Sequence, residues 1–345
     1  MNLPISQLIP ILCLIVFLSS GSAALAQNAR NGNTFQTGNE LGLPLQSTPG
    51  TEFGAISSNV KVFGALNSAE SCIYDAEREL IIVPSQGVRQ TIQENDGYIS
   101  LINTDGTVHT VRWIGVQNTQ QRETLNPKLV LNDPLGSEIA GGILYVADRD
   151  GGTDSSAPSI AVIRRFDLKT GRPLEDIRLE DSPWINDIAV AEDGTIYTTQ
   201  TGDMGPDPDP QSWLVWKITP EGRISIFSVA GPIDKPNGIA IDPEGNIVVA
   251  NFGNHDILTY SPNGELLKTE KALQPGSDGL EILPDGTKYI SSVTHGGVSR
   301  IRPGEEAELI AENIPSAASM CYDPDNNQLI IPMTSQSSLA FIPLD

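Results

Sequence analysis

Residues 236–251 read PNGIAIDPEGNIVVAN. The segment is an apolar run, a Pro-Glu-Gly turn and a second apolar run, which is the pattern of a β-hairpin. Related segments recur along the chain: ESCIYDAERELIIVPS (70–85), GSEIAGGILYVADRDG (136–151), INDIAVAEDGTIYTTQ (185–200), SDGLEILPDGTKYISS (277–292) and ASMCYDPDNNQLIIPM (318–333). The chain therefore contains six copies of one hairpin, which is the signature of a repeat architecture.

The spacing of the copies indicates which repeat architecture it is. Successive hairpin turns lie 41 to 62 residues apart, which leaves room for two more strands such as LVWKIT (214–219) and ISIFSV (224–229). Six repeats of four strands predict an all-β fold, a six-bladed β-propeller over residues 57–345. A pair of β-sandwiches, the competing arrangement, does not require a similar hairpin in every repeat. The last repeat ends one strand short, so we expect VKVFGAL (60–66) to join the last blade and close the ring.

Composition supports this class and excludes several partners. The 345 residues include 32 Gly and 25 Pro, too many breaks for long helices. Acidic residues outnumber basic ones 43 to 21, and the formal net charge is −22. Nucleic acid and anionic membrane surfaces are therefore excluded as partners, because both require clustered Lys and Arg. A divalent cation or a small-molecule ligand is compatible with this charge. We expect a monomer.

The N-terminal region has the pattern of an export signal. Residues 1–26 contain no Asp, Glu, Lys or Arg, and LIPILCLIVFL (8–18) precedes a small-residue Ala-Leu-Ala end at residue 26. This predicts a cleaved signal peptide, with an uncleaved anchor as the alternative. Residues 27–56 are polar and have no apolar period, which predicts a poorly ordered leader. The protein is then secreted or periplasmic, with no membrane span after cleavage.

Two cysteines remain after such cleavage, Cys72 and Cys321. Two cysteines do not make a disulfide framework, and both lie in apolar, strand-like runs. We expect buried free thiols. A bridge between the first and last repeats is the alternative.

Polar residues occupy one equivalent position in four of the six repeats. They stand at the start of the first strand, which lines the central channel of a propeller: Glu70, Asn186, Asn237 and Asp278. Two carboxylates and two amide oxygens form a hard-oxygen set that suits Ca²⁺, with Mg²⁺ or Mn²⁺ as alternatives. The competing interpretation is that Asn and Asp before Gly are turn residues.

These positions resemble the motifs of the SMP-30/gluconolactonase/LRE-like family, six-bladed propellers that include calcium-dependent lactonases. The resemblance covers roughly residues 60–345, and it rests on AESCIYD (69–75), WIND (184–187), PNG (236–238) and SDGL (277–280). It implies that Glu70, Asn237 and Asp278 are metal ligands, that Asn186 contacts substrate or metal, and that Asp278 is the base. Ser71-Cys72 departs from the family's usual Gly-Pro. The short motifs also resemble NHL-type repeats and the strictosidine synthase and paraoxonase relatives.

The function expected from this site is metal-dependent hydrolysis of lactones or related small esters. A bound cation polarises a carbonyl, and a carboxylate beside it accepts a proton from water. Asp278 is the expected base, and Asp187 is expected to point away from the site. The alternatives are a non-catalytic propeller that binds a small ligand or a protein partner, and a propeller recruited for another small-molecule reaction such as a cyclisation. The acidic loops 148–154 and 202–211 are expected to be exposed, or to form a lid or a second cation site.

Overall fold

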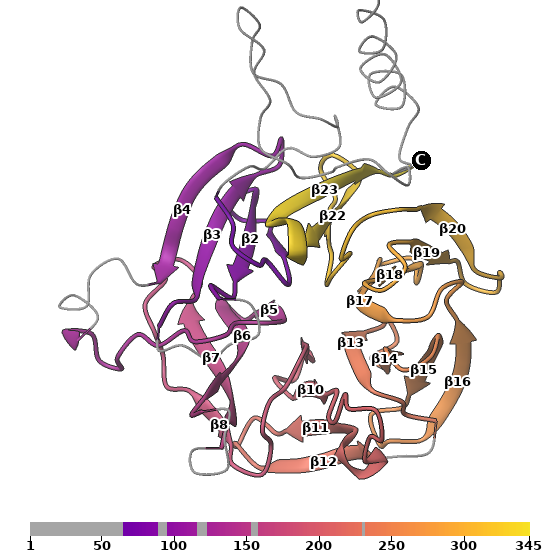
Figure 1. The fold of residues 1–345 in the computed structure, drawn as a ribbon, viewed down its shortest axis with the longest axis horizontal. Helices are drawn as coiled ribbons and strands as arrows, with labels where there is room; N and C mark the ends of the chain where they lie inside the picture. Colours follow the sequence, from indigo (N-terminus) through magenta and orange to yellow (C-terminus); the bar gives the residue numbers. More distant parts are fainter. Residues whose placement is uncertain (1–64, 89–94, 116–122, 153–157, 230–231) are drawn as a thin grey trace, which may run out of the picture.

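The structure is a computed structural model, and it describes residues 65–345 apart from 89–94, 116–122, 153–157 and 230–231. Six antiparallel sheets stand around a central axis, as Figure 1 shows. In each sheet the strands follow one another in chain order, from the innermost strand to the outermost. The predicted six-bladed β-propeller is confirmed.

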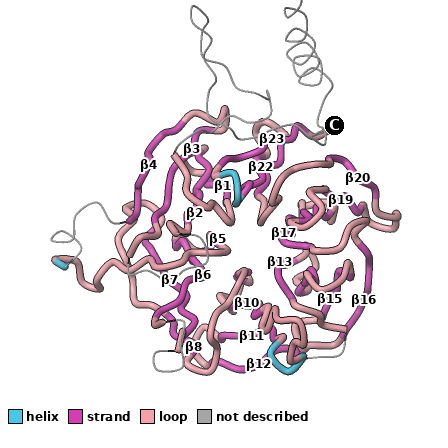
Figure 2. The backbone as a smooth tube through the Cα atoms, viewed as in Figure 1, coloured by secondary structure: helices cyan, strands magenta, loops and turns pink. Residues whose placement is uncertain are grey.

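The strand bounds are as follows. The first two blades contain β1 (Ile73–Asp75), β2 (Leu80–Ser85), β3 (Tyr98–Asn103), β4 (Val108–Gly115), and β5 (Ser137–Ala140), β6 (Ile143–Asp150), β7 (Ile160–Asp167), β8 (Ile177–Leu179). The third and fourth contain β9 (Ile188–Val190), β10 (Ile196–Gln200), β11 (Leu214–Ile218), β12 (Ile224–Val229), and β13 (Pro236–Ile241), β14 (Ile247–Asn251), β15 (Asp256–Tyr260), β16 (Leu266–Lys271). The last two contain β17 (Ser277–Ile282), β18 (Lys288–Ser292), β19 (Val298–Ile301), β20 (Glu308–Ala311), and β21 (Cys321–Asp323), β22 (Gln328–Met333), β23 (Ser338–Pro343). The 3-10 turns η1 (Pro210–Ser212) and η2 (Thr334–Gln336) are short, and Figure 2 shows that strands and loops dominate the chain.

The hairpin turns lie where the repeats predict them. Each turn position has a backbone φ between 46° and 86°, in the left-handed region that Gly and Asn tolerate best: Glu79, Gly141, Gly194, Gly245, Gly286 and Asn327. The repeated turn therefore reverses the chain between the first and second strands of every blade.

The core is divided among the interfaces between blades. Six apolar clusters lie between adjacent blades, and successive residues of one strand enter different clusters. In β2, Leu80 and Ile82 pack toward the second blade, whereas Ile81 and Val83 pack toward the last blade. Because both faces of an inner strand are covered, the strands are continuous apolar runs and do not alternate with polar residues.

The ring closes between the first and last blades. One cluster joins β2 to Leu339 and Phe341 of β23, and Ala65 and Leu66 are buried in it. The predicted closing strand was 60–66; residues 60–64 lie outside the described part, and Ala65 and Leu66 are not in a strand. The last sheet has three described strands. Packing between the two ends of the described chain therefore closes the ring.

A disulfide joins Cys72 to Cys321 at this closure, with a Cα–Cα distance of 5.5 Å. The expectation of free thiols was wrong. Cys72 immediately precedes β1 and Cys321 begins β21, so both stand at the start of the innermost strand of their blades. Ring closure brings these positions together although 249 residues separate them in sequence.

The predicted signal peptide and leader, residues 1–56, lie outside the described residues. In the part of the chain that is described, no helix has the length and apolar character needed to span a membrane.

Candidate functional site

The four polar residues predicted from the repeats line one cavity. This mouth cavity lies at the N-terminal ends of the innermost strands and has a volume of about 640 Å³. Each of the four residues is only 5–7% exposed: Glu70, Asn186, Asn237 and Asp278. The structure therefore brings together all the residues that the sequence singled out, from four different blades.

Local irregularities in the innermost strands position two of these side chains. Asn237 and Gly238 lie within β13, and the strand pairing shifts register between Pro236 and Ile239. Asp278 stands at the equivalent shift in β17. Such bulges re-aim a side chain out of the regular pleat. The interpretation of these motifs as turns is therefore wrong, because both lie inside strands.

The glycines that follow Asn237 and Asp278 allow adjacent blades to approach closely. A Cβ on Gly238 would lie 2.4 Å from the backbone oxygen of Asp278. A Cβ on Gly279 would lie 2.6 Å from the backbone nitrogen of Met320. The backbone nitrogen of Ser319 in turn donates to the oxygen of Glu70, at 3.1 Å. The segments that carry the site are thus in direct backbone contact from the fourth blade around to the first.

Three oxygen atoms of the site are buried without a hydrogen bond among the described residues: Glu70 Oε2, Asn186 Oδ1 and Asn237 Oδ1. Burying an acceptor without a partner costs about 1–3 kcal/mol, so native proteins rarely do so. Carboxylate and amide oxygens are the ligands of hard cations such as Ca²⁺. The donor set therefore fits a cation. Within the described ranges no cluster of three or more His, Cys, Asp or Glu could hold a metal, so the amide oxygens are needed.

The raised pKa of Glu70 also fits a cation site. Burial raises the pKa of its carboxyl group well above the usual range, and the nearby Asp278, Asp187 and Asp133 raise it further. These are the effects expected when carboxylates gather in a site without a positive charge. A bound cation would favour the ionised form of Glu70.

An acidic and a basic residue on the second blade also line the mouth cavity, and sequence reasoning missed both. Arg149 Nε donates to Asp133 Oδ2 at 2.8 Å. Burial raises the pKa of Asp133 to about 6, although Arg149 opposes the rise. Asp148 supports this wall, because it accepts from the backbone nitrogen of Asp133 and from Arg164 Nε, each at 2.7 Å. The expectation that the segment from Asp148 is an exposed loop was wrong at its start, since Asp148 and Asp150 belong to β6.

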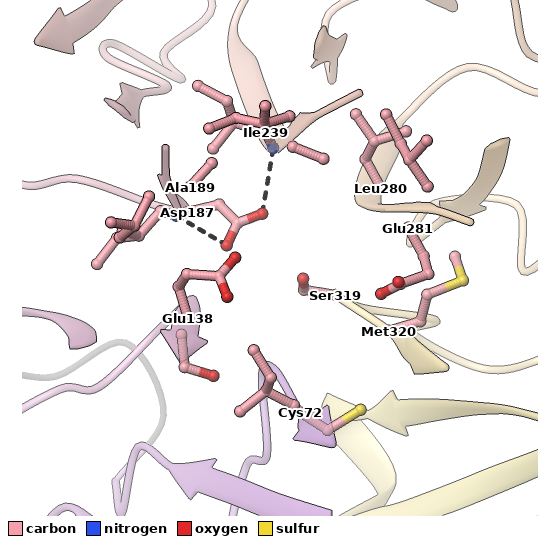
Figure 3. A pocket seen from close by; sticks show the side chains of 16 residues that line it. Cys72, Glu138, Asp187, Ala189, Ile239, Leu280, Glu281, Ser319 and Met320 are labelled. Carbon is pink, nitrogen blue, oxygen red and sulfur yellow. Dashed lines mark hydrogen bonds between the residues drawn. The ribbon is translucent and has the colours of Figure 1, made fainter. Parts of the chain in front are cut away.

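A second, smaller cavity follows further along the innermost strands. This channel cavity has a volume of about 220 Å³, and Figure 3 shows Glu138, Asp187 and Glu281 pointing into it. Asp187 accepts from the backbone nitrogens of Ile188 at 2.9 Å and Ile239 at 3.2 Å. It points away from the mouth cavity, as predicted, but it stays inside the channel.

The carboxyl groups of the channel cavity have raised pKa values. Burial raises the pKa of Asp187 to about 7 and, with help from Asp187, that of Glu138 to about 8. Burial, then Glu138 and Asp187, raise the pKa of Glu281 to about 8. The sequence carried a signal for two of them, because Glu138 precedes Ile139 and Ala140, and Glu281 lies between Leu280 and Ile282.

The loop between β10 and β11 reaches the mouth cavity, where Met204 forms part of the lining. Asp203 orders this loop, since its carboxylate accepts from the backbone nitrogens of Gly205 and Asp209 at 2.8 and 3.3 Å. Residues 203–207 are exposed, as expected of a connecting loop, and Met204 lines the site. Neither His255 nor His295 lines the mouth cavity.

Comparisons with known proteins agree with this fold. A family model described as NHL repeat matches residues 234–266, which belong to the fourth blade. No protein of curated function matches the sequence significantly. Among solved structures, a gluconolactonase from Xanthomonas campestris is 18% identical with a TM-score of 0.56, covering 84% of this chain and 89% of that one. A virginiamycin B lyase from Staphylococcus aureus is 12% identical with a TM-score of 0.55, covering 83% and 98%.

A third structure, of a protein assigned as a gluconolactonase, is 18% identical with a TM-score of 0.55 and covers 81% of this chain and 89% of its own. The shared fold supports the resemblance to the SMP-30/gluconolactonase group that the sequence motifs indicate. At this identity the likeness concerns the propeller and not the reaction, because one propeller fold supports unrelated chemistries.

Proposed function

We propose that this protein is a cation-dependent hydrolase of lactones or related small esters that acts outside the cytoplasm. The observation that carries the proposal is the convergence of four polar side chains on one cavity, where three buried oxygen atoms have no hydrogen bond to any residue that the structure describes. The gluconolactonases that share the fold support the hydrolase class.

Four residues would hold the cation: Glu70, Asn186, Asn237 and Asp278. Ca²⁺ fits this oxygen-rich set best, and when bound it supplies positive charge that polarises an ester carbonyl. Glu70 is the main anionic ligand and Asn237 a neutral one. Asn186 would contact the cation or the substrate through its Oδ1, which has no hydrogen bond within the described part of the chain, while its amide nitrogen donates to Thr201 Oγ1 at 3.3 Å.

The chemical step uses Asp278 as a general base. Its carboxylate accepts a proton from water as the water oxygen attacks the carbonyl carbon. The bond from that carbon to the ring oxygen then breaks, and the leaving oxygen takes the proton back from Asp278. Water and lactone become a hydroxy acid, and the carboxylate of Asp278 is regenerated.

The proposed location rests on two features. Residues 1–26 have the pattern of a signal peptide. The Cys72–Cys321 disulfide is of the kind that persists in oxidising compartments and is rare in the cytosol. Together they favour secretion or the periplasm.

A second candidate is a different small-molecule reaction at the same cation site. It is favoured by the virginiamycin B lyases, which have the same fold at similar TM-scores. A ligand-binding propeller without catalysis is the remaining alternative.

The test combines cation binding with turnover. Ca²⁺ should raise the melting temperature of the wild type, since binding to the folded state alone adds about 2.7 kcal/mol at 100 times Kd. Glu70→Gln should abolish most of this shift. The matched control is Glu281→Gln, which removes a carboxylate from the channel cavity. This variant should show the same rise in melting temperature with Ca²⁺ as the wild type.

Turnover is then measured at saturating cation with a panel of lactones. Asp278→Asn should lower kcat by about 10²–10⁴-fold, the usual contribution of a general base. A chelator should abolish wild-type activity. If the wild type binds a cation but hydrolyses no lactone, the hydrolase proposal fails. If no cation shifts the melting temperature, the cation site itself is refuted.

A further inference from the structure

The mouth cavity has one predominantly apolar side. Four apolar side chains on that side come from the third, fourth and fifth blades: Trp184, Met204, Phe252 and Val293. Trp184 precedes β9, whereas the other three follow β10, β14 and β18. Thr201 and Thr294 line the same side, and their hydroxyl groups donate to the backbone oxygens of Pro236 and Pro275, at 2.9 and 3.2 Å.

The opposite side of the cavity is polar. The sixth, first and second blades contribute mainly hydrogen-bonding and charged residues to the lining: Gln86, Asp133, Arg149, Ser316 and Thr334. Leu135 on the second blade is an exception. It is 8% exposed and belongs to the apolar cluster against which Trp184 packs. The cavity is therefore amphipathic, with the four candidate oxygen ligands between a polar and an apolar side.

Three of the four apolar side chains have no role in the core. Met204, Phe252 and Val293 belong to none of the six apolar clusters of the described residues. Met204 is 47% exposed, although Asp203 holds its loop in place through backbone hydrogen bonds. Ordered apolar side chains that are left uncovered at a cavity typically contact a ligand.

Trp184 gives this side a supported aromatic surface. It packs against the cluster between the second and third blades, and Ser182 Oγ donates to its backbone oxygen at 3.0 Å. A ring held from behind in this way presents its remaining surface to the cavity with little loss of conformational freedom on binding.

We propose that the substrate is a lactone with an apolar substituent, bound with the substituent against Trp184, Met204 and Phe252 and with the ester carbonyl beside the candidate oxygen ligands. The inference rests on the proposed hydrolase function and assigns its substrate class. A polyhydroxylated sugar lactone would place hydroxyl groups against this wall, where they would lose water without gaining partners. An alkyl or aryl group would instead be removed from water there.

The experiment compares lactones with the same six-membered ring, and the spontaneous hydrolysis of each is subtracted because the hydroxyl groups of a sugar lactone make its ester bond more reactive. They are δ-valerolactone, δ-decalactone with a pentyl chain, and D-glucono-δ-lactone. Burial of one methylene is worth about fourfold in affinity, so δ-decalactone should have a kcat/KM at least tenfold above that of δ-valerolactone. D-Glucono-δ-lactone should be the poorest of the three. Equal rates for the first two, or a preference for the sugar lactone, would overturn the inference and leave the hydrolase proposal standing.

Substitutions on the apolar side of the mouth cavity test whether that side causes the preference for δ-decalactone. Met204→Ala and Phe252→Ala should each reduce the ratio of kcat/KM between δ-decalactone and δ-valerolactone by about fivefold or more, and Met204→Leu should retain most of it. The matched control is Leu267→Ala, which truncates a 51% exposed apolar residue on β16. It should leave the ratio unchanged. A ratio that none of the cavity variants alters would refute the assignment of the apolar side.

A binding measurement separates the substrate class from the reaction. A cyclic ketone with the same pentyl chain has a carbonyl group but no ester bond to hydrolyse. It should quench tryptophan fluorescence saturably, Trp184→Phe should lose that quenching, and Phe252→Ala should weaken binding about tenfold. Such binding without hydrolysis of any lactone would sustain the apolar site and refute the hydrolase. Equal affinity for the ketone with and without its chain would refute the apolar site.

Discussion

Removal of the Cys72–Cys321 disulfide should lower the free energy of unfolding by about 5 kcal/mol. The bridge joins residues 249 positions apart, and the chain-entropy relation gives about 5.5 kcal/mol for a loop of that size. Both sulfur atoms lie at the interface between the first and last blades, so the same substitution also opens the ring to separation at that interface. We therefore expect a loss near the upper end of the range for single disulfides.

The measurement is denaturant unfolding of the oxidised wild type beside the double variant Cys72→Ser/Cys321→Ser. Wild type treated with a reductant should match the double variant. The control is the double variant treated with the same reductant, which should unfold as the untreated double variant does, because it has no Cys72–Cys321 bridge to reduce. A difference below about 1 kcal/mol between oxidised wild type and the double variant would refute the role of the bridge in holding the ring closed.

Three further outcomes follow from buried contacts. Arg164→Met should destabilise the fold by about 3–5 kcal/mol in denaturant unfolding, because it leaves the buried Asp148 without its charge partner; a loss below 1 kcal/mol would contradict this. Glu138 and Glu281 each have a folded pKa of about 8 against 4.5 for the free group, so the folded state holds more protons between those pH values and stability falls as pH rises through that window. Glu281→Gln should therefore gain more stability over wild type at pH 8 than at pH 5, by up to about 3–4 kcal/mol in denaturant unfolding at both pH values; an equal gain at the two would refute the titration. Gly279→Ala should cost about 1–3 kcal/mol and displace Asp278, since the added Cβ meets the backbone of Met320 at 2.6 Å; an unchanged unfolding midpoint would show that the contact relaxes freely.

The fold could be predicted from the sequence because the same short sequence pattern recurs in each blade. An apolar run, a turn at positive φ and a second apolar run are local features, and Glu79 and Asn327 adopt that turn without glycine. The four-residue site could be predicted for the same reason. Residues at one position of a repeat come together on the axis of a ring, whatever their distance along the chain.

Contacts between blades could not be predicted in this way, because they depend on how near two repeats approach in space. The pairing of Cys72 with Cys321 requires the two ends of the ring to meet. The glycine after Asp278 serves close contact with the next blade and not a turn, and the difference lies in a neighbour that is distant in sequence.

What the sequence by itself determined is the repeat: six hairpins, the continuous apolar runs of their inner strands, and one polar position at the start of four of them. Hydrophobic period and turn chemistry act within a few residues, so they can be read along the chain. Only the tertiary structure decided that the loop with Met204 and the segments with Trp184 and Phe252 give the site an apolar side. Their meeting is set by blade packing and loop conformation, which the order of residues within a single repeat does not specify.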